Sequence, residues 1–397
     1  MNKNYEEDMQ YTVKYSRFFL KAIGVWPLIA EHTSTREKIV SIFLIIFFSF
    51  CVLFVLIPSS YYCFFYVTDV TVMIELYGPI SYCALIGVKY CYLGVKATTY
   101  GRCMKHMEKH WISVEDAEQR GILKGNTSVA RKITTVCAVL FYSSTGSYYI
   151  AMPLWSPVFR RSETDRPLVH PGYEFFVDEQ ATPTYEFIFI MHCCYCFVTC
   201  SVSTANCSLI ALFSSHARGL IQVQVARLRD LVEHEGKDIK SQSRLSVIVK
   251  NHVEILTFTK NVAQALQEVC FAEVLASVIV TCAAEYLCVL EFKNHNTIAT
   301  GTYLGLIFSF VFNIFIICYA GQLLVDEGER LGDAYYDIKW YNLPKKKSAS
   351  LILIIAASKK SPKLTGGKIF EISIPTFSSV LRSSVVYMNL CQAVSAW

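Results

Sequence analysis

Residues 39–57 read IVSIFLIIFFSFCVLFVLI and contain no charged side chain. A helix needs about 20 mostly apolar residues to cross the hydrocarbon core of a bilayer, and this run comes close to that length. Pro58 follows it, and the aromatic-rich segment 61–66 (YYCFFY) comes directly afterwards. Aromatic side chains are enriched at membrane interfaces, so the stretch is typical of a transmembrane helix with one end at the interface.

The composition of the whole chain agrees with a membrane location. Of the 397 residues, 53% are apolar and 17% are charged, and the mean hydropathy is +0.36. A soluble domain has about a quarter of its residues charged. Most of the 16 cysteines lie inside apolar runs, and we interpret them as small buried hydrophobic residues rather than as a disulfide framework. The first 38 residues contain no cleavable signal peptide, so we expect the first span to direct membrane targeting.

Six further apolar runs can each cross a bilayer. They cover residues 72–95, 133–155, 187–216, 269–290, 298–325 and 369–393. Glu75 and Lys89 lie near the two ends of the second run, and we expect both to reach the interface. Glu273 and Glu285 lie within the fifth, and we expect them to face protein or water rather than lipid. The sequence thus predicts an all-α membrane protein with seven transmembrane helices.

Lysine and arginine are distributed unevenly between the connecting segments. Residues 1–38, 96–132, 215–268 and 326–368 hold 31 of the 37 basic residues. Because basic loops stay on the cytoplasmic side, this pattern predicts a cytosolic N-terminus, and an odd number of spans places the C-terminus outside. That orientation is opposite to that of a G-protein-coupled receptor. A glycan on the Asn126-Thr127-Ser128 sequon, which falls in a predicted cytosolic loop, would contradict it.

These boundaries divide the chain into a cytosolic segment (1–38), helices one to six (39–325), a cytosolic anchor segment (326–368) and the last helix with a short extracellular tail (369–397). Residues 215–268 keep a helical period. Leu245, Ile248, Val249, Ile255, Val262 and Leu266 fall broadly on one face. Either this is an amphipathic surface helix, or helices four and five continue into the cytosol and pack there. The overlong fourth run favours the second interpretation.

The anchor segment is rich in aromatic residues without being a span. Its predicted packing surface between subunits consists of Tyr336, Trp340, Tyr341 and Pro344. The run Leu351–Ala357 lies between lysine clusters and is too short to cross a bilayer, so we expect a buried helix there.

Residues that could carry chemistry are few. His192 and Cys196 lie one helical turn apart, as zinc ligands can, but no second pair accompanies them and packing is the better interpretation. Residues 365–369 (TGGKI) resemble a phosphate loop only in part, because Pro362 replaces its first glycine and no Ser or Thr follows the lysine. His110 belongs to a charge-rich stretch that we expect to be a solvated helix face. We expect no enzyme, no metal or cofactor, and no nucleic-acid partner.

The seventh span differs from the others because it is rich in small polar residues. Ser379, Ser383, Val386 and Leu390 are spaced to form one stripe, with hydroxyls at one end and apolar groups toward the outer end. Small residues allow close helix packing, which is one interpretation. The other is that several such helices surround a wetted pore closed by a hydrophobic constriction. Arg382 should in either case point to protein or water.

Four motifs mark the last quarter of the chain. They are AYY at 334–336, WYNLP at 340–344, KLTGG at 363–367 and FSSVLRSS at 377–384. Together with Phe18-Phe19-Leu20 and Gly24-Val25-Trp26-Pro27 near the N-terminus, they resemble the insect odorant receptor family. Length and topology agree over the whole chain, whereas the middle spans match only in pattern.

This resemblance implies a tetrameric, ligand-gated, non-selective cation channel. It also implies a pore lined by the seventh helix, with Leu390 at the outer hydrophobic gate, and a cytosolic anchor made from helices four to seven. Volatile ligands of such receptors bind among the outer halves of helices two, three, four and six. Carried over to this chain, that region includes Tyr77, Tyr148, Met152, Phe187, Met191, Tyr195, Tyr303 and Phe308. A position facing lipid or the core is the alternative for each of them.

Within the family, the chain resembles a ligand-tuning subunit rather than the shared co-receptor. The co-receptor carries a long insertion between helices four and five, which this sequence lacks. A co-receptor partner, a small volatile ligand and a location in the plasma membrane of a sensory dendrite are therefore implied. The alternatives are a gustatory-type channel, whose last-helix motif is absent, and a G-protein-coupled receptor, which requires an outside N-terminus.

Overall fold

The structure, a computed structural model, describes residues 5–31, 33–114, 116–155, 166–233, 241–337, 352, 355–356 and 363–395. Helices dominate this part of the chain. The first half contains α1 (Tyr5–Ala22), α2 (Trp26–Ile29), α3 (Thr35–Phe65), α4 (Val70–Val95), α5 (Ala97–Ser113), α6 (Ala117–Gly146), the π-helical segment η1 (Ser147–Ala151) and α7 (Met152–Trp155). The second half contains η3 (Tyr173–Phe175), α8 (Thr184–Glu233), α9 (Ser241–Lys293), α10 (Thr297–Asp337), β1 (Thr365–Gly366), β2 (Phe370–Glu371) and α12 (Ile374–Ser395).

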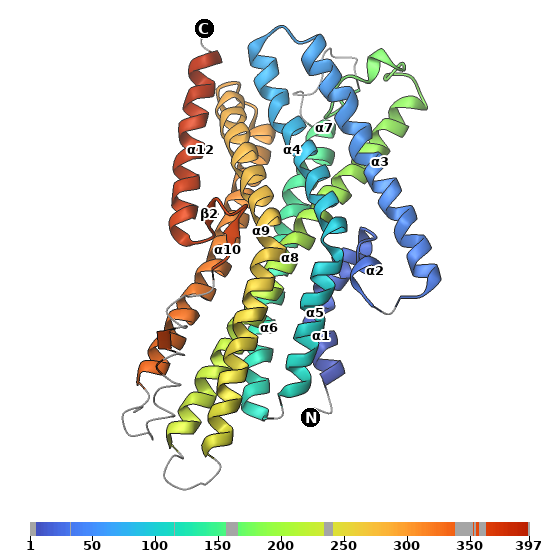
Figure 1. Cartoon of the computed structure of the whole chain (residues 1–397). Helices are drawn as coiled ribbons and strands as arrows, with labels where there is room; N and C mark the ends of the chain where they lie inside the picture. The colour runs from blue at the N-terminus through green and yellow to red at the C-terminus, as the bar shows by residue number, and fades with distance from the viewer. Residues whose placement is uncertain are drawn as a thin grey trace.

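The three longest helices set the shape of the bundle. Helices α8, α9 and α10 contain 50, 53 and 41 residues. At about 1.5 Å per residue they are roughly 60 to 80 Å long, about twice the thickness of the hydrocarbon core. Their lower ends extend toward the N-terminal end of the bundle, whereas the C-terminus lies at the opposite end (Figure 1). The interpretation that helices four and five continue as long helices is confirmed, and that of a separate surface helix is wrong.

Seven helical segments match the seven predicted spans. Five are long and apolar enough to cross a membrane within the described ranges: α3, residues 72–95 of α4, 184–229 of α8, 246–293 of α9, and α10. The other two are more polar. Helix α6 continues through η1 into α7 and packs along α8 more extensively than any other pair of helices. Helix α12 lies against α9 and α10 at one edge of the bundle (Figure 1).

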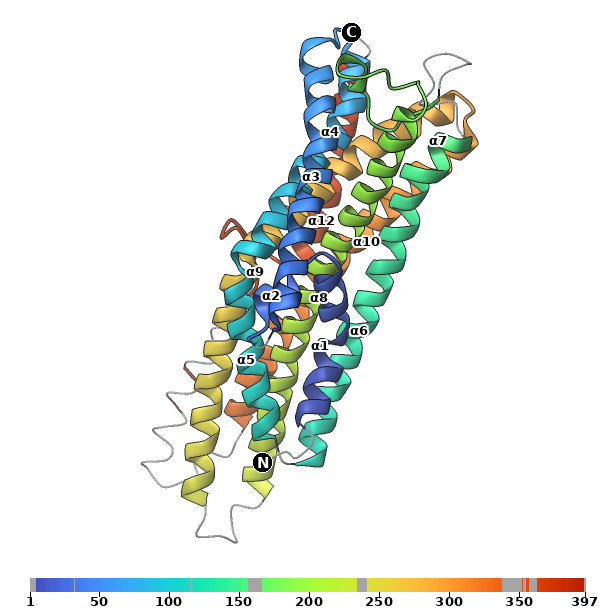
Figure 2. The same cartoon turned by 90° about the vertical axis from the view of Figure 1, so that its right-hand side faces the viewer.

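Local signals explain where the first span begins. Helix α3 begins before the apolar run because Ser34 caps it. The Ser34 hydroxyl accepts a hydrogen bond from the Glu37 backbone N–H (3.2 Å), and the Glu37 carboxylate accepts one from the Ser34 N–H (3.3 Å). The preceding segment is also helical: α1 and α2 pack against α5 and α8 in the lower half of the bundle (Figure 2).

A buried ion pair joins α4 to α9. Lys89 and Glu273 are both fully buried, with Nζ 3.0 Å from Oε2. Glu273 also accepts hydrogen bonds from the side-chain amides of Asn206 (3.1 Å) and Asn313 (3.3 Å). The prediction that Lys89 reaches the interface is wrong, because Lys89 lies on the same inward face of α4 as Tyr82. The prediction that Glu273 faces protein is confirmed.

The lower parts of the long helices have a core of their own. Ile248, Ile255, Val262 and Leu266 of α9 are all buried, as their spacing predicts. His110 of α5 also faces inward, with Nδ1 3.3 Å from Nε2 of His216, so the prediction of a solvated face is wrong there. Burial lowers the pKa of His110 to about 4.

A short hairpin connects this region to the last helix. Strands β1 and β2 pair antiparallel, and the turn between them contains Gly367 at φ +58°. The Gly367 N–H donates to the Gln267 carbonyl of α9 (2.8 Å), so this amide is not available to bind a phosphate. Gly321 of α10 lies so close to the Ile372 carbonyl that a β-carbon at this position would overlap it. The hairpin therefore fixes the point at which the chain enters α12.

The predicted subunit anchor is only partly within the described residues. Tyr336, near the end of α10, is exposed as a surface contact requires. Trp340, Tyr341 and Pro344 lie outside the described residues, as does most of the predicted helix Leu351–Ala357.

Candidate functional site

The upper half of the bundle contains a small cavity between α4, η1, α9 and α10. Its volume is about 50 Å³, and its lining is almost wholly apolar. Tyr82, Tyr148, Tyr149 and Tyr303 supply the aromatic surface, and aliphatic residues of α9 and α10 supply most of the rest. A concave apolar site with a few hydroxyl groups suits a small, weakly polar ligand. We call this space the inner cavity.

A larger cavity of about 430 Å³ lies beside the inner cavity. The two share Pro79, Tyr148, Leu287 and Tyr303, so they lie side by side. The outer segment between α7 and α8 contributes part of the lining, including Val169. We call this larger space the vestibule. Its lining extends from the residues shared with the inner cavity to the outer segment.

The π-helical turn at η1 explains how two consecutive tyrosines face the inner cavity. In a regular α-helix neighbouring residues point about 100° apart, whereas the wider turn of η1 changes the direction locally. Tyr148 and Tyr149 are both buried, and the ring of Tyr148 packs on that of Tyr303 at 6.2 Å between centroids. Helical spacing did not predict Tyr149, because a π-turn has no hydrophobic period of its own.

A histidine of the outer segment holds Tyr149. The Tyr149 hydroxyl lies 2.8 Å from His170 Nε2, and the two rings stack. Burial lowers the pKa of His170 to about 3, so the imidazole is neutral at physiological pH. The inner cavity is therefore connected by a hydrogen bond to the segment that lines the vestibule.

The eight predicted ligand residues fall into three groups. Tyr148 and Tyr303 line both cavities. Met152, Met191 and Tyr195 are buried in the core outside the two linings, although the Tyr195 ring packs on Tyr149 at 5.5 Å. Three others lie on the outer surface of the subunit, away from both cavities. They are Tyr77, Phe187 and Phe308, with exposed fractions of 61%, 53% and 60%. The structure therefore brings only two of the eight to the cavity.

Helix α12 presents the predicted stripe on its exposed face. Ser379, Ser383, Val386 and Leu390 all point away from the rest of the subunit, and so does Arg382. The opposite face packs against α9 and α10. The apolar end of the stripe, Val386 and Leu390, is not covered within a single subunit. It is therefore available to line a space between subunits.

A hydrogen bond between side chains connects α12 to α9, one of the helices that line the inner cavity. The Ser384 hydroxyl donates to Glu285 of α9 at 3.2 Å. Ala284 and Leu287, beside Glu285 in sequence, both line the inner cavity. Glu285 therefore faces protein, as its sequence position predicted, and α9 contacts the cavity and α12 within one helical turn.

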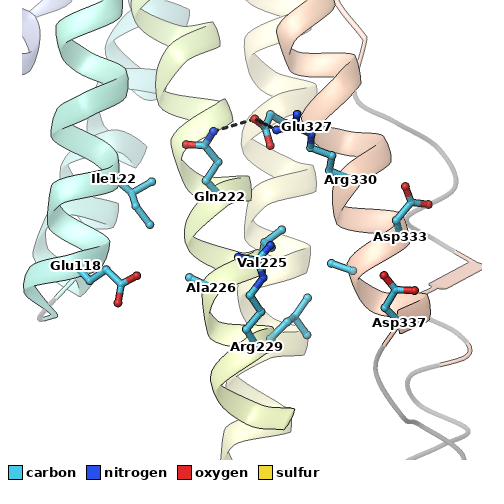
Figure 3. Close-up of a pocket in the computed structure, with 12 residues that line it drawn as sticks. Glu118, Ile122, Gln222, Val225, Ala226, Arg229, Glu327, Arg330, Asp333 and Asp337 are labelled. Carbon is cyan, nitrogen blue, oxygen red and sulfur yellow. Dashed lines mark hydrogen bonds and ion pairs between the residues drawn. The ribbon is translucent and has the colours of Figure 1, made fainter. Parts of the chain in front are cut away.

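A third hollow lies in the lower half of the bundle, between α6, α8 and α10. It measures about 700 Å³, and charged side chains such as Arg229, Arg330 and Asp333 line it (Figure 3). Gln222 donates to Glu327 across it at 2.8 Å (Figure 3). A wide charged groove of this kind does not suit an apolar volatile ligand, so the upper cavities are the better candidate site.

Comparison with known proteins gives a consistent result. A family model described as "7tm Odorant receptor" matches residues 69–385. Odorant receptor Or2 of Anopheles gambiae is 24% identical over 55% of this chain and 59% of its own length. Odorant receptor 10 of Aedes albopictus is 21% identical over 74% of this chain and 77% of its own.

A solved structure shares the fold over the full length. The insect olfactory receptor OR5 from Machilis hrabei, in complex with eugenol, superposes with a TM-score of 0.82 at 14% identity, covering 99% of this chain and 100% of OR5. A second structure of OR5 gives a TM-score of 0.76 at 15% identity. The match includes α12 and the long lower helices. The family model, the relatives and the seven-helix fold agree: this chain belongs to the seven-transmembrane odorant receptor family and is a multi-pass membrane protein.

Proposed function

We propose that this chain is the ligand-binding subunit of a ligand-gated, non-selective cation channel in the plasma membrane of a sensory dendrite. The contact of α9 with both the inner cavity and α12 is the observation that carries the proposal. A ligand between Tyr148, Tyr303 and α9 would displace α9, and the Glu285–Ser384 hydrogen bond would pass that displacement to the helix proposed to line the pore.

The pore is proposed to form where α12 helices from several subunits meet. Ser379 and Ser383 would contact water, and Val386 and Leu390 would close the pore when no ligand is bound. We expect Leu390→Ala to increase the current measured without ligand. A matched change at Leu304, exposed on α10, should leave that current unchanged.

The basic segments support a cytosolic N-terminus and an extracellular C-terminus. The contacts of Asn126 are compatible with this orientation. It is buried, and its side-chain nitrogen donates to the Ile122 carbonyl (2.9 Å) and to Gln222 (2.8 Å). A glycan on that nitrogen is incompatible with these contacts. An epitope tag at the N-terminus should bind antibody only after cells are permeabilised.

The partner is proposed to be the shared co-receptor, with this chain as the tuning subunit of a heterotetramer. The exposed Tyr336 and the aromatic segment after it would contribute to the cytosolic contact between subunits. OR5 has been solved with eugenol, and we propose that this chain likewise binds a small organic molecule.

Whole-cell recording tests the proposal. Cells that express this chain with a co-receptor should carry an inward cation current on exposure to members of an odorant panel. Cells with the co-receptor alone should not respond to the same members. A complete panel that gives no current, with surface expression verified, would overturn the channel proposal.

A further inference from the structure

The vestibule is unusually acidic for the entrance to an apolar cavity. Glu75, Glu179 and Glu291 line it, against one cationic side chain, Arg166. Arg166 is already neutralised outside the lining, because its guanidinium lies 2.9 Å from the Glu186 carboxylate. Among the described residues, acidic side chains therefore outnumber basic ones around the vestibule.

Glu291 is the side chain that points to a ligand. It is 9% exposed and lines the vestibule, near the end of α9. Within the described part of the chain, no side chain donates a hydrogen bond to its carboxylate and no cation pairs with it. Glu75, on the facing wall from α4, is half-buried and likewise has no such partner there. A carboxylate in a confined, largely apolar site is stabilised by a cation or by hydrogen-bond donors. Among the described residues, the cation of this lining, Arg166, is already paired with Glu186.

Aromatic rings complete the surroundings of these two carboxylates. Tyr62, Tyr148 and Tyr303 belong to the same lining. The face of an aromatic ring attracts an ammonium group by about 0.5–2 kcal/mol, depending on how far the site is desolvated. Carboxylates together with tyrosine rings are the combination that recognises an organic cation, and the inner cavity beyond them accepts an apolar tail.

We propose that this receptor binds small protonated amines. The ammonium group lies in the vestibule between Glu75 and Glu291, against Tyr148 and Tyr303, and the hydrocarbon end enters the inner cavity. The volumes support this division, because the inner cavity of about 50 Å³ holds only the end of a ligand and the vestibule of about 430 Å³ holds the rest. The inference rests on the proposed channel function and adds the chemical class of the ligand.

A pair of ligands that differ in charge tests the inference. We would record whole-cell currents from the receptor with its co-receptor on exposure to 2-phenylethylamine, which is protonated at neutral pH, and to 2-phenylethanol, its neutral counterpart. The wild-type receptor should respond to the amine at lower concentration. In Glu291→Gln and in Glu75→Gln, the concentration of amine for half-maximal current should rise at least tenfold, which is about 1.4 kcal/mol of binding.

The response to the alcohol controls for folding in the same variants. The concentration of alcohol for half-maximal current should change less than about threefold, which is less than ~0.7 kcal/mol. Glu174→Gln removes an exposed carboxylate from the outer segment without touching the lining, and it should leave both responses unchanged. Glu75→Gln keeps the test possible if Glu291→Gln does not reach the cell surface, because Glu75 is less buried.

Three results would overturn the inference in distinguishable ways. Neutral odorants that open the channel while amines do not would leave the channel function intact and refute the amine class. Equal loss of amine and alcohol responses would assign the carboxylates to folding. An effect of the variants that disappears when external calcium is removed would assign them to a divalent cation. Absence of current with every ligand would instead refute the proposed function itself.

Discussion

Separating Lys89 from Glu273 should destabilise the protein strongly, because both charges are buried in the apolar part of the bundle. Removing one partner of a buried ion pair costs about 3–5 kcal/mol, since the other charge stays without compensation. Lys89→Met should lie at the lower end of that range, because Asn206 and Asn313 still donate to Glu273. Glu273→Gln should lie at the upper end, because a neutral amide oxygen and the Tyr82 ring, 5.7 Å from Nζ, then replace the carboxylate beside the ammonium.

The double variant is the decisive comparison. With Lys89→Met and Glu273→Gln combined, no charge remains, and the amide introduced at position 273 can still bond to the neighbouring asparagines. Replacement of a whole buried pair is often close to neutral, so we expect the double variant to be within about 2 kcal/mol of wild type.

Thermal denaturation of the detergent-solubilised protein, followed by size-exclusion chromatography with fluorescence detection, gives the ranking. Lys105→Met is the matched control. Lys105 Nζ lies 2.8 Å from the Glu31 carboxylate, but both side chains are more than half exposed. An exposed pair contributes about 0–1 kcal/mol, so this variant should melt with wild type. A double variant that loses as much stability as the two single variants together would refute the reasoning, because the two charges would then act independently.

Further predictions concern the path from cavity to pore and the outer segment. Gly321→Ala should cause about 1–3 kcal/mol of steric strain against the segment that enters α12. This strain should displace that segment and lower the odorant-evoked current. Gly305→Ala, in open space on the same helix, should leave the current unchanged. Ser384→Ala removes a hydrogen bond to a carboxylate, worth about 1.5–3 kcal/mol, and should shift the half-maximal ligand concentration about tenfold. Ser378→Ala, at an exposed position of the same helix outside the stripe, should not shift it. Burial lowers the pKa of His170 to about 3, below the value of about 6.5 in the unfolded chain. The stability contributed by the neutral imidazole is therefore complete above about pH 6.5. It is lost at about 1.4 kcal/mol per pH unit as the pH falls toward 3. His170→Gln should therefore flatten the loss of thermal stability between pH 6.5 and 5, and an unchanged slope would contradict the assignment.

The sequence alone predicted the features that depend on local periodicity. The apolar run at 39–57 became α3, and the buried face of α9 followed the spacing of Ile248, Ile255, Val262 and Leu266. The stripe of α12 is exposed, as its spacing allows, together with Val385 and Tyr387 beside it, and its role in a pore stays a prediction. Each of these depends only on which residues lie three and four positions apart.

Features that depend on distant contacts could not be predicted from the sequence in the same way. Lys89 was expected to reach the interface because its partner could not be identified from the sequence. That partner, Glu273 on α9, is far away along the chain. Tyr149 reaches the inner cavity through a π-turn, and its position differs from what an α-helical period gives. Phe187 and Phe308 have the residue type of a ligand pocket, but their direction around the helix points them outward. Composition identifies the kind of site, whereas helix rotation decides which aromatic residues form it.

The buried ion pair also has a consequence for how the chain is made. Helix α4 is synthesised before α9, so Lys89 enters the membrane while its carboxylate partner does not yet exist. A lysine within an apolar span costs about 2.5–3.5 kcal/mol during insertion, and this cost lasts until α9 arrives. The nascent bundle therefore stays incomplete, and exposed to retention by the quality-control machinery of the cell, until α9 has been inserted beside α4.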